Sequence, residues 1–271
     1  MLGKLLKYEM KAGLRLLPIV YLGMVSAFLL GLLARAIGIF QIQLFLSILL
    51  AVGGVAAVLM TLVLVILRCF KGLFGAEGYL TQTLPVGKGT LLLAKAIAAY
   101  GWMLIGILAA VAALVGCLWI SGSDLGSIWA IVFGNETRGQ GALLLYVAVV
   151  GAAQLLAFLG ELYFAVAFAN TRPFLRNNVV FSVLFFFITN FAVSLLELAG
   201  MLLIPLGIQF GASGAEWVSQ SMLDMLGAGY TGNSLSELAT IGIGSVFVDV
   251  AVGIALLLVA RWLLTHKTSV K

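Results

Sequence analysis

Six long apolar runs divide this chain, and they constrain its fold more than any other feature. The first, residues 16–34, has no charged side chain over 19 positions. At 1.5 Å per residue, a helix of that length spans the hydrocarbon core of a bilayer, which is about 30 Å thick. The five later runs are longer. We therefore predict six transmembrane helices, at residues 16–34, 42–67, 96–120, 142–169, 179–206 and 242–264.

The composition makes lipid the main solvent of the chain. Hydrophobic residues make up 63% of the sequence, charged residues only 9%, and the mean hydropathy is +1.20. A soluble domain needs a polar exterior that this composition does not provide. The basic residues lie at the ends of the apolar runs and do not cluster with aromatic residues, so we expect no nucleic-acid partner. The predicted fold is an all-α, polytopic membrane protein whose residues 1–271 form a single transmembrane domain in the lipid bilayer.

The segment before the first predicted span, residues 2–17, has the pattern of an amphipathic helix. Its apolar residues recur along one helical face. Its basic residues follow the same period on another face: Lys4, Lys7, Lys11 and Arg15. A helix divided in this way lies flat in the headgroup region, with its lysines attracted to anionic lipid. We therefore predict an interfacial helix at residues 2–17.

The distribution of lysine and arginine predicts the orientation of the chain. Of the 15 basic residues, six spans place 13 on one side of the membrane. Only Arg35 and Arg138 fall on the other side. Because short cytoplasmic loops carry an excess of lysine and arginine, the basic side is predicted to be the cytoplasm. Both termini and the connector at residues 68–95 are then cytoplasmic, and residues 207–241 are extracytoplasmic.

The connector between the second and third predicted spans has features of a docking surface. It reads RCFKGLFGAEGYLTQTLPVGKGTLLLAK over residues 68–95. A basic amphipathic stretch is followed by glycines and by a proline, both of which break helices. Three aromatic residues, Phe70, Phe74 and Tyr79, lie in or next to this stretch, and aromatic side chains anchor many interfaces. A solvated connector without a partner remains the alternative interpretation.

Two segments resemble a known family. GLFGAEGYLTQTLPVGKGTLLLAK is similar to the cytoplasmic loop of bacterial ABC exporter permeases of the type-2 export class, and LGKLLKYEMKA resembles their N-terminus. The rest of the chain matches in topology only. The resemblance implies a permease subunit whose N-terminal helix and first cytoplasmic loop contact a separate ABC ATPase subunit. By position, it assigns the ATPase contacts to Phe70, Phe74, Glu77, Gly78, Tyr79, Leu84 and Pro85.

The same resemblance implies the remaining properties of such a protein. It would dimerise with an identical or a related permease in the bacterial plasma membrane and export a substrate. The apolar span walls favour an amphipathic or hydrophobic substrate over an anion. In this class the segment between the fifth and sixth spans, here 207–241, often folds partly back into the membrane.

The chain offers no convincing catalytic or cofactor site. Residues 87–90, Gly-Lys-Gly-Thr, lack the spacing of a phosphate-binding P-loop. Ser213 lies in a Gly-x-Ser-Gly pattern, but His266, the only histidine, is predicted to lie across the bilayer from it. One histidine and two separated cysteines do not predict a metal site. We expect no enzyme activity and no cofactor on this chain, with ATP and magnesium bound by the partner ATPase.

Three carboxyl groups lie within the last three predicted spans: Glu161, Glu197 and Asp249. A charged group inside a membrane is costly and often functional. One interpretation is that they fix helix packing through hydrogen bonds with Gln154 or Asn190. The other is that they line a substrate path, which also permits an alternative function, an ion- or proton-coupled secondary transporter. A third class, a membrane scaffold or immunity protein that only binds, stays open as well.

Overall fold

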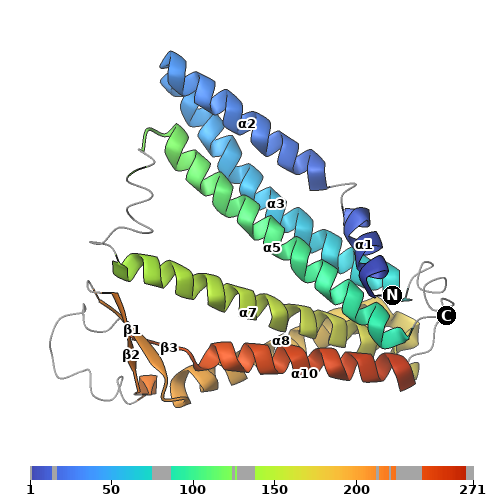
Figure 1. Ribbon diagram of the computed structural model, residues 1–271. Coiled ribbons are helices and arrows are strands. Elements are labelled where there is room, and N and C mark those ends of the chain that lie inside the picture. The colour runs from blue at the N-terminus through green and yellow to red at the C-terminus, as the bar shows by residue number, and fades with distance from the viewer. Residues whose placement is uncertain are drawn as a thin grey trace. The chain divides into compact units, whose positions relative to one another are not determined.

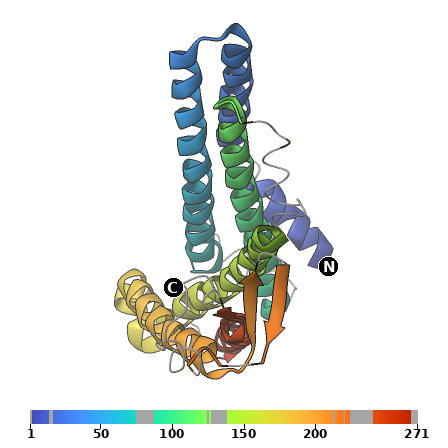
Figure 2. The ribbon, with the colours of Figure 1, turned by 90° about the vertical axis from the view of Figure 1, so that its left-hand side faces the viewer.

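The structure is a computed structural model, and it forms two compact units (Figures 1 and 2). The first comprises residues 1–128 with 270–271, and the second comprises residues 129–269. The structure describes residues 2–13, 17–74, 87–123, 126, 138–211, 214–219, 221–223 and 240–266.

The first unit is built of helices that run side by side (Figure 1). Its described helices are α1 (Leu2–Gly13), α2 (Leu17–Ile37), α3 (Phe40–Phe74) and α5 (Lys88–Ile120). The helix α3 contacts both α2 and α5, and α1 contacts α5. The turn between α2 and α3 depends on Gly38, whose φ of 81° is readily adopted by glycine. Its amide and that of Ile39 donate to the carbonyl oxygen of Ala34, which ends α2 with the bonds of a helix C-cap.

Small residues allow α3 and α5 to approach closely. A Cβ atom added to Gly54 would lie 3.0 Å from the Cβ of Ala113 and 3.4 Å from the Cα of Ala110. Such contacts between small residues are typical of helix packing in membranes. The core around them contains Met24, Leu50, Ala57, Ala113 and Ile120.

Two polar side chains bind the carboxyl end of α5. The guanidinium of Arg35 donates to the carbonyl oxygen of Trp119, and the side-chain amide of Gln43 donates to that of Ile120. The last carbonyls of a helix lack partners within the helix. These two bonds therefore hold α2 and α3 to the end of α5.

The second unit combines long helices with a small sheet. Its helices are α7 (Arg138–Ala169), the 3₁₀ helix η2 (Arg172–Asn177), α8 (Asn178–Leu203) and α10 (Gly244–His266). Its strands are β1 (Gly207–Gly211), β2 (Gly214–Val218) and β3 (Thr240–Gly242), in the antiparallel order β2-β1-β3. The strands β1 and β2 lie beside α7 (Figure 2).

Glycines bring the helices of the second unit into backbone contact. A Cβ atom on Gly160 of α7 would lie 2.7 Å from the carbonyl oxygen of Gly253 in α10. A Cβ atom on Gly253 would in turn lie 3.0 Å from the amide nitrogen of Ala157. The pair Gly200 and Gly244 brings α8 to α10 in the same way. Any larger side chain at these positions would force the helices apart.

The prediction of six long apolar helices is confirmed. Within the described residues, six helices are long and apolar enough to cross a membrane. Their apolar stretches are Leu17–Ile37, Phe40–Phe70, Gly89–Ile120, Gly141–Ala169, Asn178–Leu203 and Gly244–His266. The single transmembrane domain, the interfacial position of α1 and the cytoplasmic location of both termini stay predictions.

The structure is predominantly helical, consistent with the expected all-α fold, and residues 207–241 add a small sheet that was not predicted. This segment contributes three strands, with Gly207 opposite Val218 and Gly211 opposite Gly214. Ile208 and Phe210 are apolar residues that favour strands, and the glycines flank them where the chain turns. Residues 224–239 lie outside the described part, so partial re-entry into the membrane stays a prediction.

Candidate functional site

The first candidate site is the attachment of α1 to the two helices that border the connector. The Nζ atom of Lys95, in α5, lies 2.6 Å from Oε1 of Glu9. The guanidinium of Arg68, in α3, donates to the backbone oxygen of Glu9 at 2.8 Å. Arg68 and Lys95 are the first and last residues of the connector, so Glu9 contacts both of its ends.

The ion pair is shielded from solvent on the lysine side. The side chain of Lys95 is 8% exposed and that of Glu9 is 22% exposed. A buried ammonium group that loses its partner carries a large desolvation cost, so the pair fixes α1 more firmly than an exposed pair would. Gly13, at the end of α1, adds a second attachment, because its α-carbon packs directly on the ring of Trp102.

Most of the predicted ATPase contacts lie outside the described residues. Phe70 is half-buried within α3, and Phe74 is the last residue of that helix. The other predicted contacts are outside the described part of the chain: Glu77, Gly78, Tyr79, Leu84 and Pro85. Sequence reasoning did not identify Glu9 and Lys95. A signal was present, since Glu9 is the only acidic residue in the N-terminal helix.

The second candidate site is a cluster of the three intramembrane carboxyl groups. Glu161 lies on α7, Glu197 on α8 and Asp249 on α10. Glu161 and Asp249 are each only 2% exposed, and Glu197 is half-buried. The structure thus brings together the three residues that the sequence predicted separately.

One hydrogen bond is formed at this carboxyl cluster. The amide Nδ2 of Asn190 donates to Oε2 of Glu161 at 3.1 Å. The Oδ1 atom of Asp249 is buried and has no hydrogen-bond partner within the described part of the chain. Of the two polar partners proposed from the sequence, Asn190 binds the cluster and Gln154 is an exposed side chain.

The backbone contact between α7 and α10 positions the cluster. Glu161 follows Gly160 directly, and Asp249 lies one helical turn before Gly253. Because Gly160 and Gly253 touch, the two acidic side chains are brought to the same region between the helices. The spacing of small residues was the signal that could have predicted this convergence.

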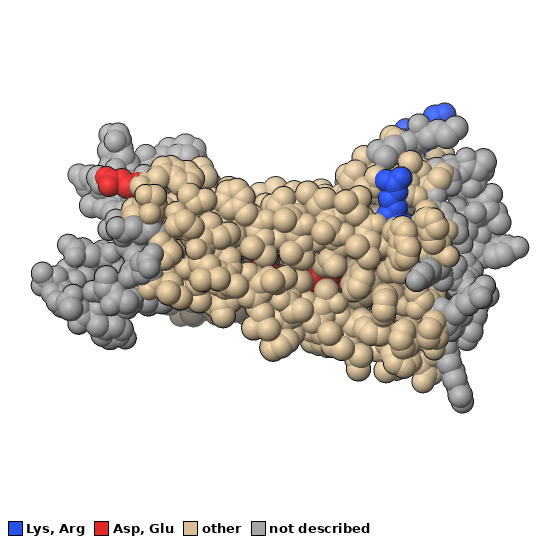
Figure 3. Space-filling model, turned by 90° about the horizontal axis from the view of Figure 1, so that it is seen from below, with Lys and Arg blue, Asp and Glu red and all other residues tan. Residues whose placement is uncertain are grey.

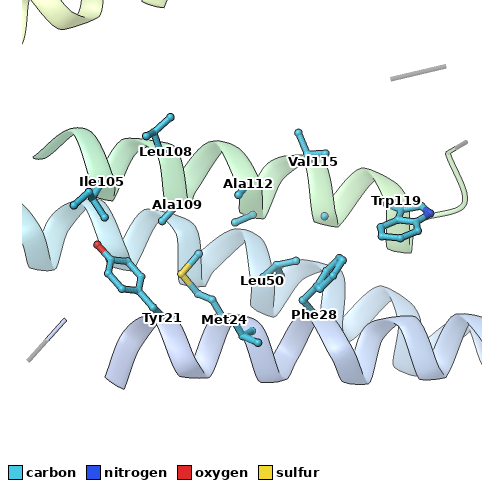
Figure 4. A pocket seen from close by; sticks show the side chains of 13 residues that line it. Tyr21, Met24, Phe28, Leu50, Ile105, Leu108, Ala109, Ala112, Val115 and Trp119 are labelled. Carbon is cyan, nitrogen blue, oxygen red and sulfur yellow. The ribbon is translucent and has the colours of Figure 1, made fainter. Parts of the chain in front are cut away.

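The third candidate site is an apolar groove in the first unit (Figure 4). Its volume is about 790 Å³. In Figure 4, Tyr21 and Ile105 lie at one end and Trp119 at the other. The lining is almost wholly apolar and comes from three helices, with Tyr21, Met24, Val25 and Phe28 from α2, Leu50 from α3, and Ile105, Leu108, Ala109, Ala112, Ala113, Val115, Gly116 and Trp119 from α5.

Histidine and cysteine are not gathered with acidic residues in the described structure. No group of three or more His, Cys, Asp or Glu side chains there could hold a metal ion. Both cysteines are free, Cys69 buried and Cys117 half-buried. His266 is exposed and stacks on Trp262, while Ser213 lies outside the described residues.

The six long apolar helices define a multi-pass membrane protein. No protein-family model matches the chain, and neither the curated proteins nor the solved structures contain a significant match.

Proposed function

We propose that the chain is the membrane-spanning permease subunit of an ATP-driven ABC exporter of the type-2 export class. The observation that carries this proposal is the attachment of α1, through Glu9, to both helices that border the connector. The N-terminal segment and the connector are the two segments that resemble this family. Because α1 is held at the helices on either side of the connector, an ATPase that binds one of them meets the other.

In this proposal, the chain crosses the bacterial plasma membrane with both termini and the connector in the cytoplasm. The helix α1 lies at the cytoplasmic headgroups, where its exposed lysines, Lys4, Lys7 and Lys11, attract anionic lipid. The permease pairs with an identical or related chain. The ATPase subunits bind ATP and magnesium, and their movements reach the spans through α1 and the connector.

The apolar groove supports an amphipathic or hydrophobic substrate. Ile105 and Trp119 are 14 residues apart on α5, a distance of about 21 Å along the helix. The lining is almost wholly apolar over that length. The groove therefore suits an elongated apolar part of such a substrate.

Changing two connector residues is expected to abolish ATPase binding. In the double variant Glu77→Ala, Tyr79→Ala, the chain loses a charge and an aromatic ring that the family resemblance places at the ATPase surface. Interface anchors of this kind cost about 2 kcal/mol or more when truncated, so the double change should weaken binding at least 30-fold. The measurement is a pull-down of the detergent-solubilised protein with an ATPase encoded in a neighbouring reading frame.

A matched variant and the wild type decide the result of this pull-down. Gln82→Ala changes a connector residue that is not among the predicted contacts and should bind like the wild type. Binding by wild type and Gln82→Ala, but not by the double variant, would support the proposal. If the wild type binds none of the ATPases of its host, the proposal is wrong.

The carboxyl cluster favours a second candidate, a proton- or ion-coupled secondary transporter. Three acidic side chains on α7, α8 and α10 converge within the membrane-spanning helices, as a relay would require. This candidate predicts transport by the purified protein in vesicles with an ion gradient and no ATPase, and loss of that transport in Glu161→Gln. Transport that needs ATP and survives Glu161→Gln would rule it out.

A further inference from the structure

The two faces of the small sheet have opposite character. Successive residues of a strand point to opposite faces, so a row of residues paired across the strands belongs to one face. One row, called here the tryptophan row, consists of Trp217, Ile208 and Ile241. The next row, on the other face, consists of Val218, Gly207 and Gly242. The tryptophan row is bulky and apolar, whereas its neighbour contains two glycines.

The face with the glycines packs on the helices. Gly207 and Gly242 are both buried. A Cβ atom on Gly242 would clash with the backbone oxygen of Met201 in α8. The hydroxyl of Tyr146, in α7, donates to the carbonyl oxygen of Gly242 at 3.3 Å. Because this face of the sheet is turned toward the helices of the second unit, the tryptophan row on the other face is turned away from them.

Trp217 is the most exposed large apolar side chain of the described structure. Its exposed fraction is 76%. Leu206, just before β1, and Leu223, shortly after β2, are exposed as well. Exposed apolar surface of this extent marks a contact with lipid or with another protein. The level of the sheet in the membrane decides between these two partners.

The contact with α7 indicates this level. The apolar stretch Gly141–Ala169 has 29 residues and is about 43 Å long. The hydrocarbon core is about 30 Å thick, so about 6 Å of a centred stretch extends into the headgroups at each end. Tyr146, which binds β3, follows Gly141 by five residues, about 7 Å along the helix. The sheet therefore lies near the boundary between headgroups and hydrocarbon.

The connections of the sheet place it at the same boundary. The strand β1 begins four residues after Leu203, where the apolar stretch of α8 ends, and β3 ends two residues before Gly244, where that of α10 begins. The exposed side chains of Leu203 and Phe247 make these helix ends apolar on the outside. Figure 3, which views the molecule from the side of α10, shows few charged side chains between its two ends. The apolar surface of the helices thus continues to the sheet.

The edges of the sheet limit how deep it can lie. In the order β2-β1-β3, the outer edges of β2 and β3 have backbone groups that no strand of the described structure pairs. Open sheet edges do not occur in contact with hydrocarbon, where water cannot satisfy these groups. The headgroup layer supplies both water for the edges and lipid for the apolar face.

We propose that the sheet binds the headgroup layer of the bilayer, with the tryptophan row facing the lipids. Tryptophan is enriched in this layer, because its ring is apolar and its N–H group can donate to a polar partner. The segment between α8 and α10 is then held on the membrane boundary and does not extend into the solvent at this point. This inference does not depend on the exporter function, because it needs only that the six apolar helices cross a membrane.

Spin labels on two neighbouring residues of β2 test the proposal. Trp217→Cys and Glu216→Cys are made in the full chain, with both native cysteines replaced by alanine, and studied in phosphatidylcholine nanodiscs. A nitroxide at 217 should collide more often with oxygen, which concentrates in lipid, than with a water-soluble nickel chelate. Glu216 is exposed on the opposite face, so a label there should show the reverse preference. Ile254→Cys, an exposed position near the middle of α10, gives the reference for hydrocarbon.

Three results would overturn the proposal. Equal access of the nickel chelate to the labels at 217 and 216 would mean that the tryptophan row faces water. A preference for oxygen as strong as at 254 would mean that the sheet lies in the hydrocarbon. Broadening of the spectrum at 217 by the label of a second copy would mean that the row is a contact between two chains.

A second measurement keeps the native tryptophan. In protein labelled with 5-fluorotryptophan, the ¹⁹F signal of Trp217 is identified by its loss in Trp217→Phe. Lipids with a nitroxide on the headgroup should broaden this signal strongly, and lipids with a nitroxide at the end of the acyl chain should leave it sharp. A signal that neither lipid broadens would overturn the proposal, and so would one broadened mainly by the label at the chain end.

Discussion

Replacing Gly160 with leucine is expected to abolish the packing of α7 against α10. A Cβ atom at this position would lie 2.7 Å from the carbonyl oxygen of Gly253, closer than van der Waals contact allows. That oxygen belongs to the backbone, so a whole helix must move to make room. Overpacking of a tight core costs about 1–3 kcal/mol when side chains adjust, and we expect the upper end of that range or more here.

The melting temperature of the purified protein in detergent, with its elution profile, measures this effect. Gly151 lies on the same helix, and a Cβ atom there would meet nothing within 4 Å. Gly151→Leu should therefore melt like the wild type, while Gly160→Leu should melt well below it or elute as aggregate. Equal melting temperatures for the two variants would contradict the glycine contact between α7 and α10.

Removing the carboxylate of Glu9 is expected to release α1 from the helices that border the connector. In Glu9→Gln, the ammonium of Lys95 stays buried at 8% exposure without its ion-pair partner. Leaving the Lys95 charge unpaired costs about 2 kcal/mol, because the ammonium is largely buried while the neighbouring Glu9 position is reached by solvent. Since about 1.4 kcal/mol is a factor of ten, the backbone amides of α1 should exchange with deuterium about 30-fold faster.

A double-mutant cycle separates the ion pair from other effects of the change. Adding Lys95→Met removes the stranded charge, so the double variant Glu9→Gln, Lys95→Met should exchange more slowly than Glu9→Gln alone. Lys7→Met changes an exposed lysine of the same helix and should not restore protection in Glu9→Gln. Unchanged exchange of α1 in Glu9→Gln would show that the ion pair does not hold the helix.

The helices were predictable because their signal is local. A run of apolar residues as long as 16–34 leaves a membrane span as the main option, and its helix is found at Leu17–Ile37. The ends were less predictable. The third span was expected from residue 96, but its helix begins at Lys88, because a charged residue at the end of a span does not end the helix. The hydrophobic run indicates which residues are expected to lie in lipid, and the helix extends beyond the end of that run.

The strands and the candidate sites could not be predicted from the spacing of apolar residues along the chain. Frequent glycines hid the short strands of residues 207–241, since they interrupt the alternation of apolar and polar residues. The three carboxyl groups were identified individually, because a charged group in lipid is costly. Their convergence in space was not predicted, because it depends on how each helix is rotated about its axis. The contact between Gly160 and Gly253 sets this rotation for α7 and α10. The pair of Glu9 and Lys95 joins residues 86 positions apart, and no local pattern links them.

The long sequence separation of that pair has a consequence for biosynthesis. The carboxylate of Glu9 cannot meet Lys95 until a further 86 residues have been added to the chain. At about 5–20 residues per second, a ribosome needs about 4–17 s for that length. During this interval the newly made N-terminal segment has its lysines but not its anchor. The interfacial position predicted for this segment then makes the membrane surface its first expected binding partner. Its final position is set only when the third apolar helix has left the ribosome.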